Sequence, residues 1–235
     1  MIVEIWSDVM FPFCYIGKRN FESALQQFSD TDAIEVHWKS FQLDPNIPEV
    51  ATESYQNYLV TRKGMPLQQV QDMLQNVTLS AKQAGLTYNF DDAVMVNSIK
   101  AHQFIQFAKA LHKDDEAEEV LFHAFFTEGK NIADLQTLLT LGTAIGLDAN
   151  ALQQAIENQE FLPAVIEDIN QARQIGVTGV PFFVFNNKYA VSGAQPASSF
   201  LEVLNKSFGE WKATNTTPNL IISKGSSCDV KGNCD

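Results

Sequence analysis

The chain has 235 residues, of which 45% are hydrophobic and 19% are charged, so it is long enough to bury a large core. Its net charge of −12 argues against nucleic acid and anionic membrane surfaces as partners, because both repel an acidic protein. The sequence contains no apolar run long enough to span a membrane and no basic leader, so we expect a cytoplasmic protein. Its three cysteines allow at most one intramolecular disulfide.

The N-terminal part reads as a strand, a helix and a second strand. Isoleucine and valine in residues 2–6 favour a strand, and Pro12 is typical of the first turn of a helix. Apolar residues then recur at helical spacing, which predicts a buried face made of Cys14, Gly17, Phe21, Ala24, Leu25 and Phe28. Cys14 thus points inward, whereas position 11 lies at the exposed start of the helix. Residues 34–41 read as the second strand.

The middle of the chain, from about residue 52 to residue 158, reads as helical throughout. Apolar residues there form several stripes that recur every three to four positions, as in amphipathic helices. Asp134 and Asp148 stand where N-terminal helix caps are expected, and Gly85 and Gly146 stand where helices end. We therefore predict an all-helical block.

After this block, one further helix precedes two strands and a closing helix. Residues 180–185 and 189–193 read as strands, and Asn186-Asn187 between them is a hairpin signal. Pro196 opens the last helix, which is followed by a polar tail. The β-α-β start predicts a parallel pair of strands, and the hairpin adds antiparallel strands.

The segment DVMFPFCYIG, residues 8–17, has the spacing of a Cys-x-x-Cys redox site whose first cysteine is absent. In such a site the first cysteine lies at a helix N-terminus, where free N–H groups and the helix dipole favour the attacking thiolate. The second cysteine lies one turn later and resolves the mixed disulfide. Here Phe11 occupies the attacking position and Cys14 the resolving one. A buried structural cysteine is the plain alternative for Cys14.

The other two cysteines, Cys228 and Cys234, lie close together near the end of the sequence. This pair is consistent with a local disulfide, a pair of exchanging thiols, half of a metal site, or two incidental cysteines. A zinc site would need further ligands, and the four histidines show no ligand spacing, so we predict no metal. The stretch GVTGVPFF, residues 176–183, indicates by itself only a turn before a strand.

Together these segments resemble the FrnE-like branch of the DsbA family, whose members have a thioredoxin fold with a helical insertion. The resemblance covers nearly all of residues 1–208 and rests on SDVMFPFCYIGK as the active-site segment, GVTGVPFFVF as the cis-proline loop, and YAVSGAQP after it. With the element order above, it predicts an α/β, thioredoxin-like domain from residues 1–50 and 156–212. An all-helical insertion would span residues 51–155, and a flexible cysteine-containing tail would span residues 213–235.

The resemblance implies protein thiol–disulfide oxidoreductase or isomerase activity without a bound cofactor. It also implies a cis peptide bond between Val180 and Pro181, facing the start of the active-site helix. Val180 would then offer backbone hydrogen bonds to an extended substrate segment. Together with these two residues, Phe11, Pro12 and Phe13 would form the substrate-binding surface.

The departure from the family is Phe11, because the attacking cysteine belongs at that position. Some family members carry a further cysteine pair near the C-terminus, which Cys228 and Cys234 resemble. We therefore favour a disulfide oxidoreductase or isomerase with an atypical site and with Cys14, Cys228 and Cys234 as its catalytic residues. Its partners would be protein or peptide thiols and disulfides.

Two alternatives stay open. A redox-inactive, peptide-binding or chaperone-like module would use the cis-proline groove, with Phe11 and Phe13 adding apolar surface. A glutathione-dependent isomerase or transferase would bind glutathione near Phe11 and Val180. That related branch has Ser-Pro-x-Ser at this point, whereas Phe11 offers no polar atom to a thiol. The sequence makes no prediction of the oligomeric state.

Overall fold

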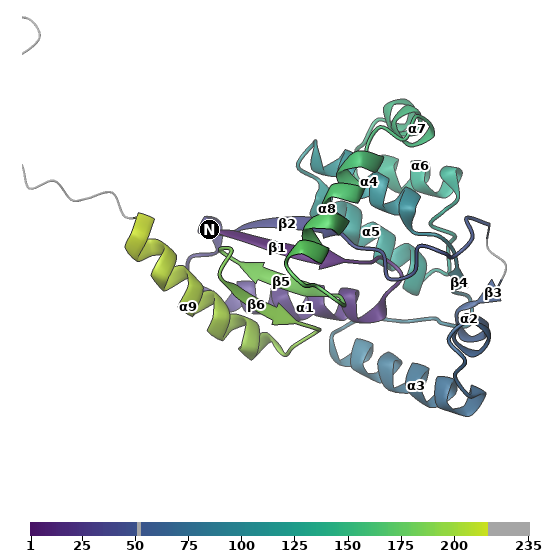
Figure 1. Cartoon of the computed structure of the whole chain (residues 1–235), viewed down its shortest axis with the longest axis horizontal. Coiled ribbons are helices and arrows are strands. Elements are labelled where there is room, and N and C mark those ends of the chain that lie inside the picture. Colours follow the sequence, from purple (N-terminus) through teal and green to yellow (C-terminus); the bar gives the residue numbers. More distant parts are fainter. Residues whose placement is uncertain (51–52, 216–235) are drawn as a thin grey trace, which may run out of the picture.

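The computed structural model describes residues 1–50 and 53–215 (Figure 1). Cys228 and Cys234 therefore lie outside the described residues. The main sheet lies beside the N-terminus, and most of the helices gather at the opposite end of the molecule (Figure 1). Of the helices in these two ranges, none is both long enough and apolar enough to cross a membrane.

The main sheet has the strand order β2-β1-β5-β6. Its strands are β1 (Ile2–Ser7), β2 (Glu35–Ser40), β5 (Phe182–Phe185) and β6 (Tyr189–Ser192). As predicted, β1 and β2 are parallel and β5 and β6 form an antiparallel hairpin, while β1 and β5 pair antiparallel between them. Asn186 and Asn187 both have positive φ, the conformation of the tight hairpin turn that this pair predicts.

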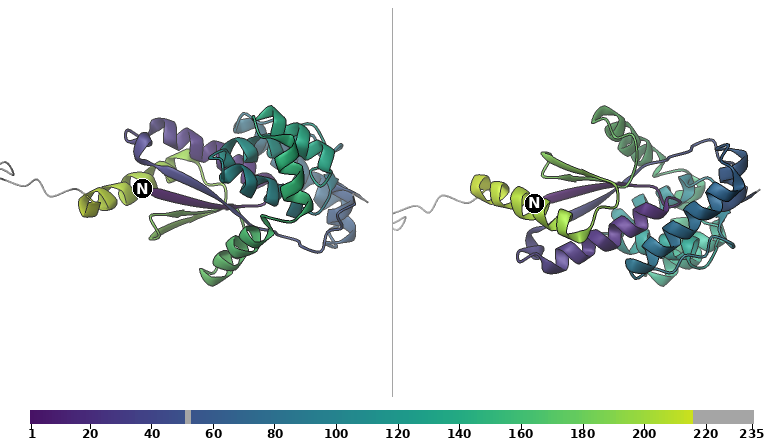
Figure 2. Two further views of the ribbon diagram at one scale, coloured as in Figure 1. Left: turned by 90° about the horizontal axis from the view of Figure 1, so that it is seen from above. Right: turned by 90° about the horizontal axis from the view of Figure 1, so that it is seen from below.

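Helices cover both faces of this sheet (Figure 2). One face carries α1 (Pro12–Gln27) and α9 (Ala197–Asn215), and the other carries α8 (Leu162–Gln174). A short 3₁₀ helix, η1 (Thr31–Ala33), leads into β2. Helix α9 extends to Asn215, the last described residue, whereas the tail is predicted to begin at residue 213.

The insertion lies between β2 and α8. Its helices are α2 (Tyr55–Thr61), α3 (Leu67–Gln83), α4 (Ile99–Lys109), α5 (Asp114–Phe126), α6 (Leu135–Ala144) and α7 (Ala149–Glu157). It differs from the prediction in one detail, because β3 (Glu53–Ser54) and β4 (Val94–Met95) form an antiparallel pair. Strands of two residues are too short to show the alternation that marks a strand in sequence. Asp134 and Asp148 cap α6 and α7 as predicted, and each carboxylate accepts a backbone N–H at 2.8 Å.

The helix α1 joins the core of the sheet to the core of the insertion. On the sheet side, Phe21 packs against Phe183 and Phe200, with ring centroids 5.5 and 5.7 Å apart. On the insertion side, Tyr15 stacks on Phe122 of α5, with centroids 4.9 Å apart. The start of α1 is therefore fixed between the two parts of the molecule.

Candidate functional site

The candidate site is centred on the first turn of α1. Phe11 is the N-cap of this helix, and Pro12 follows at its first position, where no N–H is needed. Two backbone hydrogen bonds of 2.9 Å close the turn, from Phe11 N–H to the Asp8 carbonyl and from Cys14 N–H to the Phe11 carbonyl. Phe11 is half-buried rather than fully exposed, and its ring packs on Phe13 with centroids 5.7 Å apart.

Two tyrosines of the insertion hold the backbone on either side of Phe11. Tyr55, from α2, donates its hydroxyl to the Met10 carbonyl at 3.3 Å. Tyr88, which follows α3, donates to the Pro12 carbonyl at 2.6 Å. Burial raises the pKa of both hydroxyls, so both remain protonated donors at neutral pH. The insertion thereby fixes the segment that contains Phe11, the position predicted to correspond to an attacking cysteine.

Cys14 lies on the inward side of the same turn, as predicted, and only 1% of its surface is exposed. Burial raises the pKa of its thiol well above the ordinary value, although contacts with the Asp8 backbone and the Ser7 hydroxyl act in the opposite direction. A thiol in this state is neutral and inaccessible. It therefore suits the resolving position of a redox site and not the attacking position.

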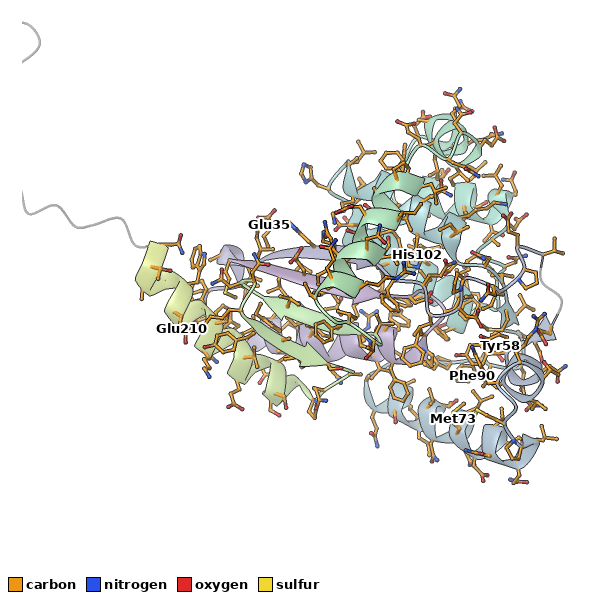
Figure 3. All side chains as sticks on the ribbon, viewed as in Figure 1. Glu35, Tyr58, Met73, Phe90, His102 and Glu210 are labelled. Carbon is orange, nitrogen blue, oxygen red and sulfur yellow. The ribbon has the colours of Figure 1, made fainter. Side chains whose placement is uncertain are left out.

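Further buried ionisable groups lie near Cys14. The Asp8 carboxylate accepts the Leu43 N–H at 2.8 Å and lies 3.6 Å from Nε2 of His102, on α4 (Figure 3). Glu118, on α5, is 1% exposed, and burial raises its pKa well above the usual range of a carboxyl group. These residues come from distant segments, so no local pattern could have identified them together.

The Val180–Pro181 peptide bond is cis, and Pro181 lies against α1. A methyl group on Gly17 would come within 2.9 Å of the Pro181 ring, so glycine permits this close approach. Val180 is buried, and within the described residues neither its N–H nor its C=O pairs with another backbone group. The loop therefore places unpaired backbone polar groups beside α1.

A pocket of about 220 Å³ opens beside Phe11, between the start of α1 and the insertion. Its walls come from the turn before α1, the loop after β2, the region of α2, and β4. Its apolar and aromatic lining consists of Met10, Phe11, Leu43, Ile47, Tyr55, Tyr58, Leu59 and Met95. Apart from Phe11, no residue of this lining was among the predicted site residues, because its members are scattered over four segments.

The structure brings the predicted residues of the active-site segment and of the cis-proline loop to the same helix. Phe11, Pro12, Phe13 and Cys14 share its first turn, and Pro181 contacts the next turn at Gly17. Cys228 and Cys234 lie outside the described residues, so their distance from Cys14 is not defined. In the described part of the chain, no group of three or more His, Cys, Asp or Glu side chains is arranged to hold a metal ion.

Comparisons with known proteins identify the family. The model of the DSBA-like thioredoxin domain matches residues 2–205. The crystal structure of a probable DsbA oxidoreductase from Streptomyces coelicolor is 32% identical, with a TM-score of 0.85, and the match covers 100% of this chain and 98% of that chain. The uncharacterized protein YwbO of Bacillus subtilis is 27% identical over 190 residues, which cover 79% of this chain and 86% of that protein.

A more distant structure shares the fold. The cytosolic disulfide reductase DsbM from Pseudomonas aeruginosa is 14% identical, with a TM-score of 0.61, and the match covers 91% of this chain and 98% of that chain. The family match includes the first turn of α1, the insertion and the cis-proline loop. The chain therefore belongs to the DSBA-like thioredoxin domain family, the family of the DsbA-like thiol–disulfide oxidoreductases.

Proposed function

We propose that this protein is a thiol–disulfide oxidoreductase or isomerase of the FrnE-like type whose attacking thiol does not lie at the start of α1. The observation that carries this proposal is the retained arrangement of Cys14 and Pro181 around a helix start occupied by Phe11. An inward thiol and a cis-proline loop on the same helix are what the resolving half of such a site requires.

In this proposal, Cys228 and Cys234 supply the attacking thiol that Phe11 cannot provide. The thiolate of Cys228 attacks a substrate disulfide, forms a mixed disulfide and releases one substrate thiolate, which takes up a proton. Attack by Cys234 or Cys14 on the Cys228 sulfur releases the second substrate thiol and leaves a disulfide within the protein. The substrate has then gained two electrons and two protons. An external dithiol must reduce the protein before the next turnover.

The substrate would be a protein or peptide in extended conformation. The unpaired backbone groups of Val180 support this proposal, because an extended segment can pair with them as an added strand. Phe11, Pro12 and Phe13 would contact its side chains. We place the protein in the cytoplasm, a compartment in which dithiol reductants keep cysteines reduced.

A redox-inactive, peptide-binding module is the second candidate. The burial of Cys14 and the raised pKa of its thiol favour it, because this cysteine cannot make the first attack on a substrate disulfide from solution in the described conformation. A glutathione-dependent enzyme has less support. Phe11 offers no polar atom, and the Lys63 ammonium beside it is paired with Asp44 at 2.8 Å.

Insulin reduction and disulfide mapping test the proposal together. In the presence of dithiothreitol, the unmodified protein should reduce insulin faster than buffer does, and the double variant Cys228→Ser/Cys234→Ser should return to the buffer rate. Mass spectrometry of the oxidised protein should find Cys228 linked to Cys234 or to Cys14. A rate equal to that of buffer for the unmodified protein would favour the binding module. A rate that survives the double substitution would rule out the tail cysteines.

A further inference from the structure

Several polar groups that line the pocket beside Phe11 are already paired within the protein. The Asp8 carboxylate accepts the N–H groups of Leu43 and Met10 at 2.8 and 3.4 Å. The Tyr55 hydroxyl donates to the Met10 carbonyl at 3.3 Å. A polar ligand would therefore have to compete with hydrogen bonds that hold the site together.

The positive charge in the pocket lining is also balanced. Lys63 lies 2.8 Å from the Asp44 carboxylate, and the Tyr58 hydroxyl donates to the same carboxylate (Figure 3). Burial alone would raise the Asp44 pKa, but these two hydrogen bonds lower it, so the carboxylate is ionised at neutral pH and balances Lys63. With Asp8 also in the lining, the pocket does not favour an anionic ligand.

The size of the pocket points to a single side chain. Its volume of about 220 Å³ is below the roughly 300–1,000 Å³ of pockets that enclose a whole small molecule. Two of the lining residues are methionines, Met10 and Met95. Methionine side chains are unbranched and polarizable, so they adapt to apolar groups of different shape.

We propose that this pocket, beside Phe11 at the start of α1, binds one large apolar side chain, such as leucine, methionine or phenylalanine, of the polypeptide substrate. The inference rests on the proposed function, because it assumes a polypeptide substrate. It assigns Met10, Leu59 and Met95 as residues that determine specificity. Substrates with an acidic residue at this position would be disfavoured by Asp8 and Asp44.

Methionine methyl NMR tests this inference, because four of the five methionines divide by location into pocket residues and controls. Met10 and Met95 line the pocket, whereas Met1 does not and Met73 lies on α3 beside a separate hollow (Figure 3). The full chain, with 13C in its methionine methyl groups, is titrated with acetyl-Gly-Leu-Gly-amide and with the same peptide carrying Asp in place of Leu. The leucine peptide should shift the Met10 and Met95 signals and leave those of Met1 and Met73 unchanged. It should bind about 10-fold or more tightly than the aspartate peptide.

A matched pair of substitutions locates the binding site. Leu59→Trp fills the pocket from α2, where Leu59 is half-buried, and should weaken binding of the leucine peptide about 10-fold or more. Leu79→Trp makes the same change at an exposed position on α3 outside the pocket and should leave binding unchanged. Equal affinity for the two peptides, or shifts at Met73 in place of Met10 and Met95, would overturn the proposal. If Leu59→Trp does not fold, the NMR titration of the unmodified protein with the two peptides still decides whether the pocket binds the leucine side chain.

The outcome is separable from that of the proposed function. The peptides contain no sulfur, so their binding does not depend on disulfide exchange. Selective binding without insulin reduction would leave the pocket assignment intact and remove the oxidoreductase proposal. Insulin reduction without selective binding would leave the oxidoreductase proposal intact and remove the pocket assignment.

Discussion

The two sides of the first turn of α1 have opposite character. The inward side, behind Cys14, holds the buried polar groups of His102 and Glu118, and Asp8 borders both sides, since it lies near His102 and also lines the pocket. The outward side, where a family member presents its attacking thiol, consists of Phe11, Phe13 and an apolar pocket. Buried polar groups are costly to a fold, so their presence behind Cys14 supports the proposal that the inward half of a redox site is kept while Phe11 replaces the outward half.

The largest effect is expected from Phe11→Cys, which restores a thiol on the outward side. A cysteine at a helix N-terminus has a lowered pKa, and Cys14 is placed to resolve its mixed disulfide. We predict insulin reduction at least about 10-fold faster than with the unmodified protein, because most of this thiol ionises at neutral pH.

The control for this change is Phe11→Ser, which removes the same aromatic ring but introduces no thiol. Its rate should not exceed that of the unmodified protein, because it gains no thiol and loses the substrate contact proposed for Phe11. Phe11→Cys could also reduce insulin no faster than the unmodified protein. This result would mean that residues other than Phe11 on the outward side also prevent disulfide exchange.

A smaller effect is expected from adding a methyl group where α1 packs against the cis-proline loop. Gly17→Ala places a methyl group 2.9 Å from the Pro181 ring. Overpacking should lower the free energy of unfolding by about 1–3 kcal/mol, whereas alanine in place of glycine in a helix should raise it by about 1 kcal/mol. We therefore expect a net loss of about 1 kcal/mol in the free energy of unfolding. Urea denaturation measures this difference. The control Gly209→Ala, in α9 with open space around it, should instead stabilise the protein, and equal effects would remove the packing argument.

A further effect, which depends on pH, concerns the titration of the inward side. Burial raises the Glu118 pKa in the folded protein, so above the ordinary carboxyl pKa of about 4.3 the folded state binds more protons than the unfolded state. The free energy of unfolding therefore falls as pH rises through this window, by at most about 1.4 kcal/mol per pH unit.

Glu118→Gln abolishes this titration. Relative to the unmodified protein, the variant should therefore gain stability as pH rises from about 4. Urea unfolding at a series of pH values measures the gain. The same substitution at exposed Glu116, also on α5, should leave the pH profile unchanged. Parallel profiles for Glu118→Gln and the unmodified protein would show that the Glu118 pKa is the same in the folded and unfolded states, and they would contradict this prediction.

The parts of the fold that follow local rules were predictable from the sequence. Strand β1, the start of α1 at Pro12 and the caps Asp134 and Asp148 agree with the structure, because each depends on neighbouring residues only. The Asn186-Asn187 turn is predictable for the same reason. Helical periodicity also placed Cys14 on the buried side of α1.

The rest depends on tertiary contacts between distant segments. The pairing of β3 with β4 involves two residues on each side, which give no periodic signal. The pocket lining and the approach of His102 to Asp8 combine segments that only the folded insertion brings together. The half-burial of Phe11 likewise follows from packing against other parts of the chain, which its position at a helix start does not reveal.

Timed alkylation of Cys14 in the reduced, unmodified protein tests the contrast between the two sides most directly. Iodoacetamide is added to folded protein and to protein in denaturant, and mass spectrometry follows the peptide that contains Cys14. Because this thiol is 1% exposed and its pKa is raised, we predict a rate at least about 100-fold slower in the folded protein. A rate within about threefold of the denatured protein would mean that Cys14 is open to solvent, and it would contradict the account of a closed inward side.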